Sequence, residues 1–185
     1  RQAYNICMIS WRGYSGAKMV TPKVHNALTI DDIREPINHV FKKYCKPHGQ
    51  RAYAVGCSMG ATVLANALGF SGDKSVLSGA VCINAIIDKT KAIGFFDQNL
   101  GGFYCDLLGK KMFEKIRENI DMFRPIFEER NIDLEAELDR RFKTGKDLNY
   151  FAYHELITAN MPQERVIGID DMSLSTFERG SKYID

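Results

Sequence analysis

The stretch RAYAVGCSMGATVLANALG, residues 51–69, decides the fold of this 185-residue chain. Its first part, residues 51–55, is a short and mostly apolar run that is typical of a buried strand. Residues 61–68 are small or aliphatic and predict a helix that ends at Gly69. Two glycines and a serine lie in the connection, residues 56–60, so we expect a sharp turn from strand to helix.

The sequence on either side predicts the same alternation of strands and helices. Residues 4–10 and 77–83 are apolar runs, and we expect each to form a buried strand. A helix is expected to begin at Thr29, with the Thr29 side chain as its N-terminal cap. Pro36 falls inside that helix and requires a late start or a kink. Strands separated by helices form parallel units, so residues 1–90 predict a partial α/β core.

The second half of the chain has a different pattern. No strand is expected from about Gly101 onward, and residues 91–185 are predicted to be helical with polar outer faces. Pro125 is expected to break this half between its first two helices. We expect the region to form an insertion or a lid on the α/β core. The predicted helices cover residues 110–123, 134–144 and 148–158.

Composition and charge argue against several classes of function. The chain is 45% hydrophobic and 26% charged, as in an ordinary soluble globular protein. A net charge of +2 without basic runs among aromatic residues gives no indication of nucleic-acid binding. No signal peptide or long apolar span is recognisable. Because the chain begins at Arg1, we expect residues upstream, and a membrane anchor in that missing region is left open.

The cysteine content predicts a reducing, intracellular compartment. The number of cysteines is odd, and no C-x-x-C pair occurs. Three of the cysteines lie in apolar runs, where cysteine acts as a small hydrophobic residue. We therefore expect no disulfide framework, no metal and no cofactor. The histidines before the turn have no metal-binding spacing either. The cysteines are Cys7, Cys45, Cys57, Cys82 and Cys105, and the histidines are His25, His39 and His48.

The turn Gly56-Cys57-Ser58-Met59-Gly60 also predicts a chemistry. A Gly-x-Ser-x-Gly pattern between a strand and a helix is typical of a serine nucleophile. We expect Ser58 at the end of a central parallel strand, in a strained conformation with positive φ, its hydroxyl facing a cleft. The backbone N–H of Met59 would then donate to a developing oxyanion. The alternative is an inert serine in a glycine-flanked turn.

Two further expectations concern the residues around Ser58. Valine at Gly60 is expected to collide with the strand end and to cost about 1–3 kcal/mol of stability. The side chain of Cys57 is expected to point into the core, which leaves a thiol function for Cys57 as a weak alternative.

Five segments resemble one branch of a known superfamily. Residues 10–16 (SWRGYSG) resemble the N-x-R-G loop after an early strand of α/β-hydrolases, and residues 29–33 (TIDDI) resemble their T-x-D-L helix start. Residues 53–61 (YAVGCSMGA) and 77–81 (LSGAV) are similar to the nucleophile elbow and the strand after it. Residues 104–108 (YCDLL) look like the start of a lid. The combination resembles the YheT-like, plant-embryogenesis-associated branch, which includes membrane-anchored phospholipases of animals.

The resemblance implies a carboxylic ester hydrolase with a Ser-Asp-His triad and no metal. Ser10-Trp11 stands where this branch usually has Asn followed by His or Tyr, and Cys57 stands where it often has Trp. The first oxyanion loop of the family precedes the strand at residue 4, and the family's acid and histidine follow the lid. We therefore expect all three to lie outside this chain.

Candidates for an acid and a base inside the chain are weaker. His154 follows Ser58 on a charged helical stretch, where a surface or lid position is the alternative to a base. Asp88 follows the third strand and could be the acid or a helix cap. Asp170 and Asp171 are further candidates for the acid, and the alternative is that both are ordinary surface residues. Four aromatic residues could line an acyl pocket or serve in packing: Phe95, Phe96, Phe103 and Tyr104.

The sequence as a whole predicts a serine ester hydrolase for a small-molecule or lipid ester. Without its base and acid, the isolated chain is expected to show no meaningful turnover. The rival hypothesis is a non-catalytic, hydrolase-like subunit of a larger assembly, because three parallel strands leave sheet edges unpaired.

Overall fold

The computed structural model describes residues 4–27, 29–88, 91–92, 95 and 98–160. As far as the chain is described, it forms two compact units. The first contains residues 4–17 and 25–87, and the second contains residues 18–24 and 88–160. The predicted division of the chain at residue 90 stays a prediction, and each unit is considered by itself.

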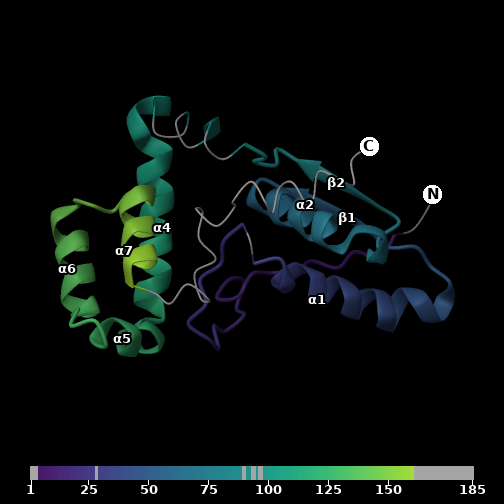
Figure 1. Cartoon of the computed structure of the whole chain (residues 1–185), viewed down its shortest axis with the longest axis horizontal. Helices are drawn as coiled ribbons and strands as arrows, with labels where there is room; N and C mark the ends of the chain where they lie inside the picture. Colours follow the sequence, from purple (N-terminus) through teal and green to yellow (C-terminus); the bar gives the residue numbers. More distant parts are fainter. Residues whose placement is uncertain (1–3, 28, 89–90, 93–94, 96–97, 161–185) are drawn as a thin grey trace. The chain divides into compact units, whose positions relative to one another are not determined.

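The first unit is built on two parallel strands, β1 (Tyr53–Cys57) and β2 (Gly79–Ile83). Their register places Val55 opposite Val81. The strands and the long connection between them form one β-α-β unit (Figure 1). The described residues therefore contain a two-stranded parallel sheet with flanking helices, which is compatible with part of an α/β fold.

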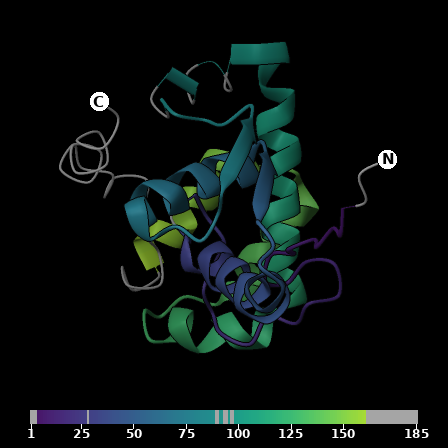
Figure 2. The same ribbon diagram turned by 90° about the vertical axis from the view of Figure 1, so that its right-hand side faces the viewer.

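Helix α2 (Met59–Ser71) packs against both strands, and helix α1 (Asp31–Val40) packs against α2. Figure 2 shows α2 on one side of the strand pair. The buried residues of α2 are small or aliphatic and include Ala61 and Val63, both fully buried. Small side chains let a helix approach a sheet closely, and the predicted helix after the turn is confirmed.

The predicted strand at residues 4–10 is wrong for the described structure. The segment has no strand assignment, and Tyr4, Ile6 and Met8 are 72%, 88% and 88% exposed. A strand needs a neighbour to satisfy its backbone N–H and C=O groups. Among the described residues, β1 pairs only with β2, so this apolar run has no partner.

The start of α1 also differs from the prediction. Its N-cap residue is Ile30, which makes no side-chain cap, so the predicted Thr29 cap is wrong. The Thr29 hydroxyl instead donates to the carbonyl oxygen of Asn26 at 2.7 Å. Pro36 lies inside the helix, which continues to Val40 and then into a π-helical turn, Phe41–Cys45, and a 3₁₀ turn, Lys46–His48.

The regular secondary structure in the described part of the second unit is helical. The 3₁₀ turn Asn99–Gly102 leads into α4 (Phe103–Glu118), which is followed by α5 (Ile120–Glu128), α6 (Leu134–Thr144) and α7 (Tyr150–Asn160). Helices α4 and α7 lie side by side in Figure 1. Gly109 of α4 lies close to the start of α7, because a Cβ atom there would lie 2.0 Å from the backbone of Asn149, the residue before α7. The core contains the fully buried Phe113, Phe123 and Phe127.

The bounds of α6 are those predicted, because Asp133 caps the helix through the N–H of Ala136 and Gly145 ends it at φ 66°. The predicted break at Pro125 is wrong, since Pro125 lies inside α5. The chain breaks instead at Asn119, whose φ of −123° is not helical. Among the described residues, no helix is long and apolar enough to cross a membrane.

Candidate active site

Ser58 lies between β1 and α2, where the sequence predicts it, and its backbone is strained. Its φ is 54° and its ψ is −122°, a conformation that side chains other than glycine rarely adopt. The residue is exposed at the carboxyl end of β1. The predicted positive φ is confirmed. The strand is not a central one in the described sheet, because β1 has a single neighbour.

The tight glycine in the turn is Gly56, not Gly60. A Cβ atom on Gly56 would lie 2.6 Å from the carbonyl oxygen of Gly60 and 2.8 Å from the Cα atom of Ala61. A Cβ atom on Gly60 would meet nothing within 4 Å. The expected collision at Gly60 is therefore wrong. The reason is that α2 doubles back over the strand end, so the strand glycine faces the helix backbone while Gly60 faces open space.

Hydrogen bonds fix the backbone on both sides of Ser58. Its N–H donates to the carbonyl oxygen of Ile83 at 2.9 Å, which ties the turn to the end of β2. Its carbonyl oxygen accepts from the N–H groups of Ala61 and Thr62 at 3.0 and 3.1 Å. These bonds hold the positive φ in place without any contribution from the hydroxyl.

Sequence reasoning missed two residues near the turn. The buried Thr62 accepts a hydrogen bond from the N–H of Ile86 at 2.8 Å and contacts the Ser58 carbonyl oxygen at 3.4 Å, so its Oγ1 joins α2 to the loop after β2. Asn84 directly follows β2 and has φ 55°. The signal for Asn84 was present, since asparagine adopts positive φ more readily than most residues and here follows a predicted strand.

Two groups at the turn are available for chemistry. Met59 is the first residue of α2, so its N–H has no partner within the helix, and no described residue accepts from it. The Ser58 hydroxyl makes no hydrogen bond to a described residue. A hydroxyl beside free N–H groups at a helix N-terminus can attack a carbonyl whose oxygen takes up negative charge there. The predicted cleft at Ser58 stays a prediction, because the two cavities described do not include Ser58.

The predicted burial of Cys57 is wrong. Cys57 is exposed on the face of the strand pair that also carries Tyr53, Val55, Val81 and Ile83. These four side chains are 59%, 71%, 55% and 46% exposed. Helix α2 packs at Gly56, which belongs to the opposite face, so this apolar face is uncovered in the described part of the first unit. Cys7 and Cys82 are exposed as well, and Cys105 is buried.

His25 lies in a packed cluster, where its Nδ1 atom contacts the Thr29 hydroxyl at 3.4 Å. Its ring stacks on Trp11 with the centroids 3.7 Å apart. Burial lowers the pKa of His25 to about 4, against the opposing effect of the Asp32 charge, so the ring is neutral near pH 7. The Asp32 carboxylate accepts from Arg12 Nε at 2.6 Å and also pairs with Arg12 Nη2, which holds the glycine-rich loop against the start of α1.

The other candidate residues fall in separate places. His39 and His48 are exposed. His154 lies on α7 in the second unit, where its ring packs edge-on against Tyr150 at 4.3 Å. Asp88 Oδ1 accepts from the N–H of Lys91 at 3.0 Å, which fits the predicted helix-cap alternative. Asp170 and Asp171 lie outside the described residues.

The four aromatic candidates do not form a buried wall in the described structure. Phe95, Phe103 and Tyr104 are 70%, 58% and 49% exposed, and the rings of Phe103 and Tyr104 meet edge-on at 5.5 Å. Phe96 lies outside the described residues. The predicted acyl pocket and its alternative, a packing role for these side chains, both stay predictions.

Within the described part of the chain, no group of three or more His, Cys, Asp or Glu side chains could hold a metal ion.

Comparison with known proteins gives two relatives in Saccharomyces cerevisiae. The chain is 23% identical over 150 residues to "Monoacylglycerol lipase", an alignment that covers 80% of this chain and 32% of the relative. It is 38% identical over 80 residues to "Medium-chain fatty acid ethyl ester synthase/esterase 2", covering 43% of this chain and 17% of the relative. The chain thus spans about a third or less of the length of the relatives it matches. No family model matches the chain. No solved structure matches it.

Proposed function

We propose that the chain is the nucleophile-bearing part of a carboxylic ester hydrolase, with Ser58 as the nucleophile. The observation that carries the proposal is the backbone of Ser58, at φ 54° and ψ −122° between a parallel strand and a helix. Such strain costs on the order of 1–3 kcal/mol and persists mainly at functional sites. An inert serine in this turn would have no use for that strain.

The two yeast relatives support the same conclusion at a coarse level. Both are named as lipid ester lipases or esterases, so an α/β-hydrolase of this general kind is the natural assignment. The narrower assignment to the YheT-like, plant-embryogenesis-associated branch rests on the sequence motifs. A Ser-Asp-His triad, completed by an acid and a histidine beyond the described residues, belongs to that narrower proposal.

The proposed reaction proceeds through an acyl-enzyme. Ser58 Oγ forms a bond to the ester carbonyl carbon, and the hydroxyl proton passes to a base. The carbonyl oxygen becomes an oxyanion that accepts from the Met59 N–H, which is worth roughly 3–4 kcal/mol of barrier. The C–O bond to the alcohol then breaks as the alcohol takes up the proton, and water later releases the acid and restores the Ser58 hydroxyl.

The proposed substrates are esters of fatty acids, either lipids or short- to medium-chain esters. The printed names of both relatives point to this class. We further propose that the helical second unit acts as a lid and that the protein functions in a reducing intracellular compartment, with membrane association left open. Five free cysteines are compatible with such a compartment.

The experiment compares Ser58→Ala with Ser78→Ala in the protein as isolated from its natural source and in the 185-residue chain. Ser78 is an exposed serine before β2 and serves as the matched control. In the natural protein, hydrolysis of a short-chain p-nitrophenyl ester should disappear with Ser58→Ala and persist with Ser78→Ala. The 185-residue chain should show no Ser58-dependent turnover. Equal activity of the two variants would refute the proposed nucleophile.

The uncovered sheet face favours a second candidate, a non-catalytic subunit of a larger assembly. Soluble proteins rarely leave a contiguous apolar surface of this kind exposed, and one edge of β1 is unpaired in the described sheet. Under this hypothesis a partner subunit covers Ser58, and the natural protein has no esterase activity. Native mass spectrometry with the ester assay separates the two: a hydrolase with Ser58-dependent activity favours the first candidate.

A further inference from the structure

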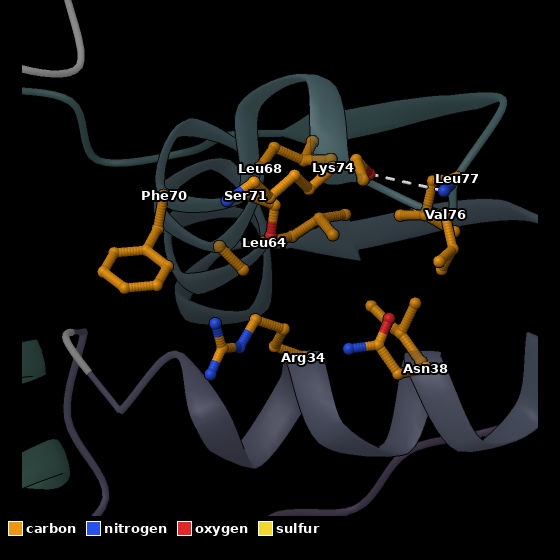
Figure 3. A pocket seen from close by; sticks show the side chains of 12 residues that line it. Arg34, Asn38, Leu64, Leu68, Phe70, Ser71, Lys74, Val76 and Leu77 are labelled. Atoms are coloured by element: carbon orange, nitrogen blue, oxygen red, sulfur yellow. Dashed lines mark hydrogen bonds between the residues drawn. The ribbon is translucent and has the colours of Figure 1, made fainter.

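A cavity of about 380 Å³ lies at the end of the strands opposite to Ser58. It is enclosed by α1, by the second half of α2 and by the segment from Lys74 to Leu77 that leads into β2 (Figure 3). Ser58 follows the other end of β1, and a five-residue strand is about 16 Å long. The cavity is therefore separate from the candidate active site.

The charged groups of the cavity are both positive. Arg34 and Lys74 belong to its lining, which contains no acidic residue. Lys74 is exposed and makes no ion pair with a described residue. Three neutral polar side chains add hydrogen-bonding capacity, namely Asn38, Ser71 and Ser75. This lining suits an anion.

Arg34 is already oriented and still has a free donor. Its Nη2 pairs with Asp31 at 2.8 Å, and its guanidinium carbon lies 5.1 Å from the centre of the Phe70 ring. The Nε atom is buried and has no hydrogen-bond partner among the described residues. Solvent does not reach this Nε atom, whereas the outer Nη1 atom makes no interaction with a described residue, so a bound anion would accept from Nη1.

The rest of the lining is apolar and would exclude a purely inorganic ion as the preferred ligand. Figure 3 shows Leu64 and Leu68 of α2 above the side chains that rise from α1, with Val76 and Leu77 at the far end. Ile37 and Ala67 complete this wall. A ligand with a charged head and a short aliphatic chain would contact both parts.

We propose that this cavity binds a small amphipathic carboxylate, with its head at Arg34 and Lys74 and its aliphatic chain against Leu64 and Leu68. The site goes beyond the proposed hydrolysis and does not depend on it, because its residues lie at the opposite end of the strands from Ser58.

The test is an NMR titration of the isotope-labelled 185-residue chain with hexanoate. The proposal requires shifts of the Arg34 Nε–H signal and of the backbone signals from Lys74 to Leu77. Hexanol and inorganic phosphate are the comparison probes, since hexanol has the aliphatic chain without the charge and phosphate has the negative charge without the chain. Both should bind at least about tenfold more weakly than hexanoate. Equal binding of hexanol would overturn the anion site, and equal binding of phosphate would overturn the apolar half.

The variants Arg34→Gln and Lys74→Gln should each weaken hexanoate binding about tenfold. Lys42→Gln, on an exposed lysine outside the cavity, is the matched control and should leave the affinity unchanged. If Arg34→Gln does not fold, Lys74→Gln still decides the question, because Lys74 has no described partner to lose. Hexanoate binding that is insensitive to Lys74→Gln, or shifts confined to other residues, would overturn the proposal.

Discussion

Gly56→Ala provides the sharpest test of the geometry at the turn. The new Cβ atom would lie 2.6 Å from the carbonyl oxygen of Gly60 and 2.8 Å from its carbonyl carbon and from the Cα atom of Ala61. All three atoms belong to the backbone of the first turn of α2. No side-chain rotation relieves these contacts, so the helix must move away from the strand.

The magnitude follows from two opposing effects. Forcing one extra carbon into a packed site costs about 1–3 kcal/mol. Replacing glycine reduces the conformational freedom of the unfolded chain, which offsets about 0.4–1 kcal/mol of that loss. We therefore expect Gly56→Ala to lower the free energy of unfolding by roughly 1–2 kcal/mol. The same substitution at Gly60 meets open space inside a helix and should raise it by about 0.5–1 kcal/mol.

The assay is urea denaturation of the two variants and the parent chain, followed by circular dichroism. The two substituted glycines lie four residues apart and each gains the same methyl group, so each variant is the control for the other. The changes in the free energy of unfolding must have opposite signs in the two variants. If Gly56→Ala is neutral, or if Gly60→Ala destabilises the chain as much, then the observed approach of α2 to the strand end is wrong.

Three other predictions concern stability and can be tested by denaturation. Burial lowers the pKa of His25 from 6.5 to about 4, so the unfolded chain binds a proton at this histidine more readily than the folded chain does. The free energy of unfolding should therefore fall by at most about 3 kcal/mol as the pH decreases from about 6.5 to 4. Denaturation at several pH values should show a smaller decrease for His25→Gln. Ser58→Ala should change the free energy of unfolding by less than about 0.5 kcal/mol, since the hydroxyl has no described partner, and a loss of several kcal/mol would show a structural role instead. Gly109→Ala should lower the free energy of unfolding by about 3 kcal/mol or more, because its Cβ atom would lie 2.0 Å from the Asn149 backbone. The control Gly69→Ala, whose Cβ atom would meet nothing within 4 Å, should not destabilise the chain. Equal melting temperatures of the two variants would contradict the packing of α4 on α7.

The local features of the turn could be predicted from the sequence because they depend on short-range constraints. The strand before Ser58 and the helix after it follow from the runs at residues 51–55 and 61–68, and the positive φ of Ser58 follows from the Gly-x-Ser-x-Gly pattern between them. The bounds of α6 were predictable for the same reason, since Asp133 and Gly145 are local start and stop signals.

The errors arose where a residue's environment depends on distant partners. Residues 4–10 have the composition of a strand but no neighbour to pair with in the described structure. Cys57 would be buried in a covered sheet, and it is exposed because no described residue covers its face of the strand pair. The choice between Gly56 and Gly60 as the tight position depends on the path of α2 over the strand, which the pattern alone does not specify.

Covalent labelling tests the central claim about Ser58 most directly. The protein as it occurs in cells would be treated with a fluorophosphonate probe, and the modified peptide would be identified by mass spectrometry, with Ser58→Ala as the control. Such probes react with activated serines, so the account predicts a label on Ser58 that is absent from the variant. An unlabelled Ser58, under conditions in which a known serine esterase in the same sample is labelled, would contradict the claim that Ser58 is a nucleophile.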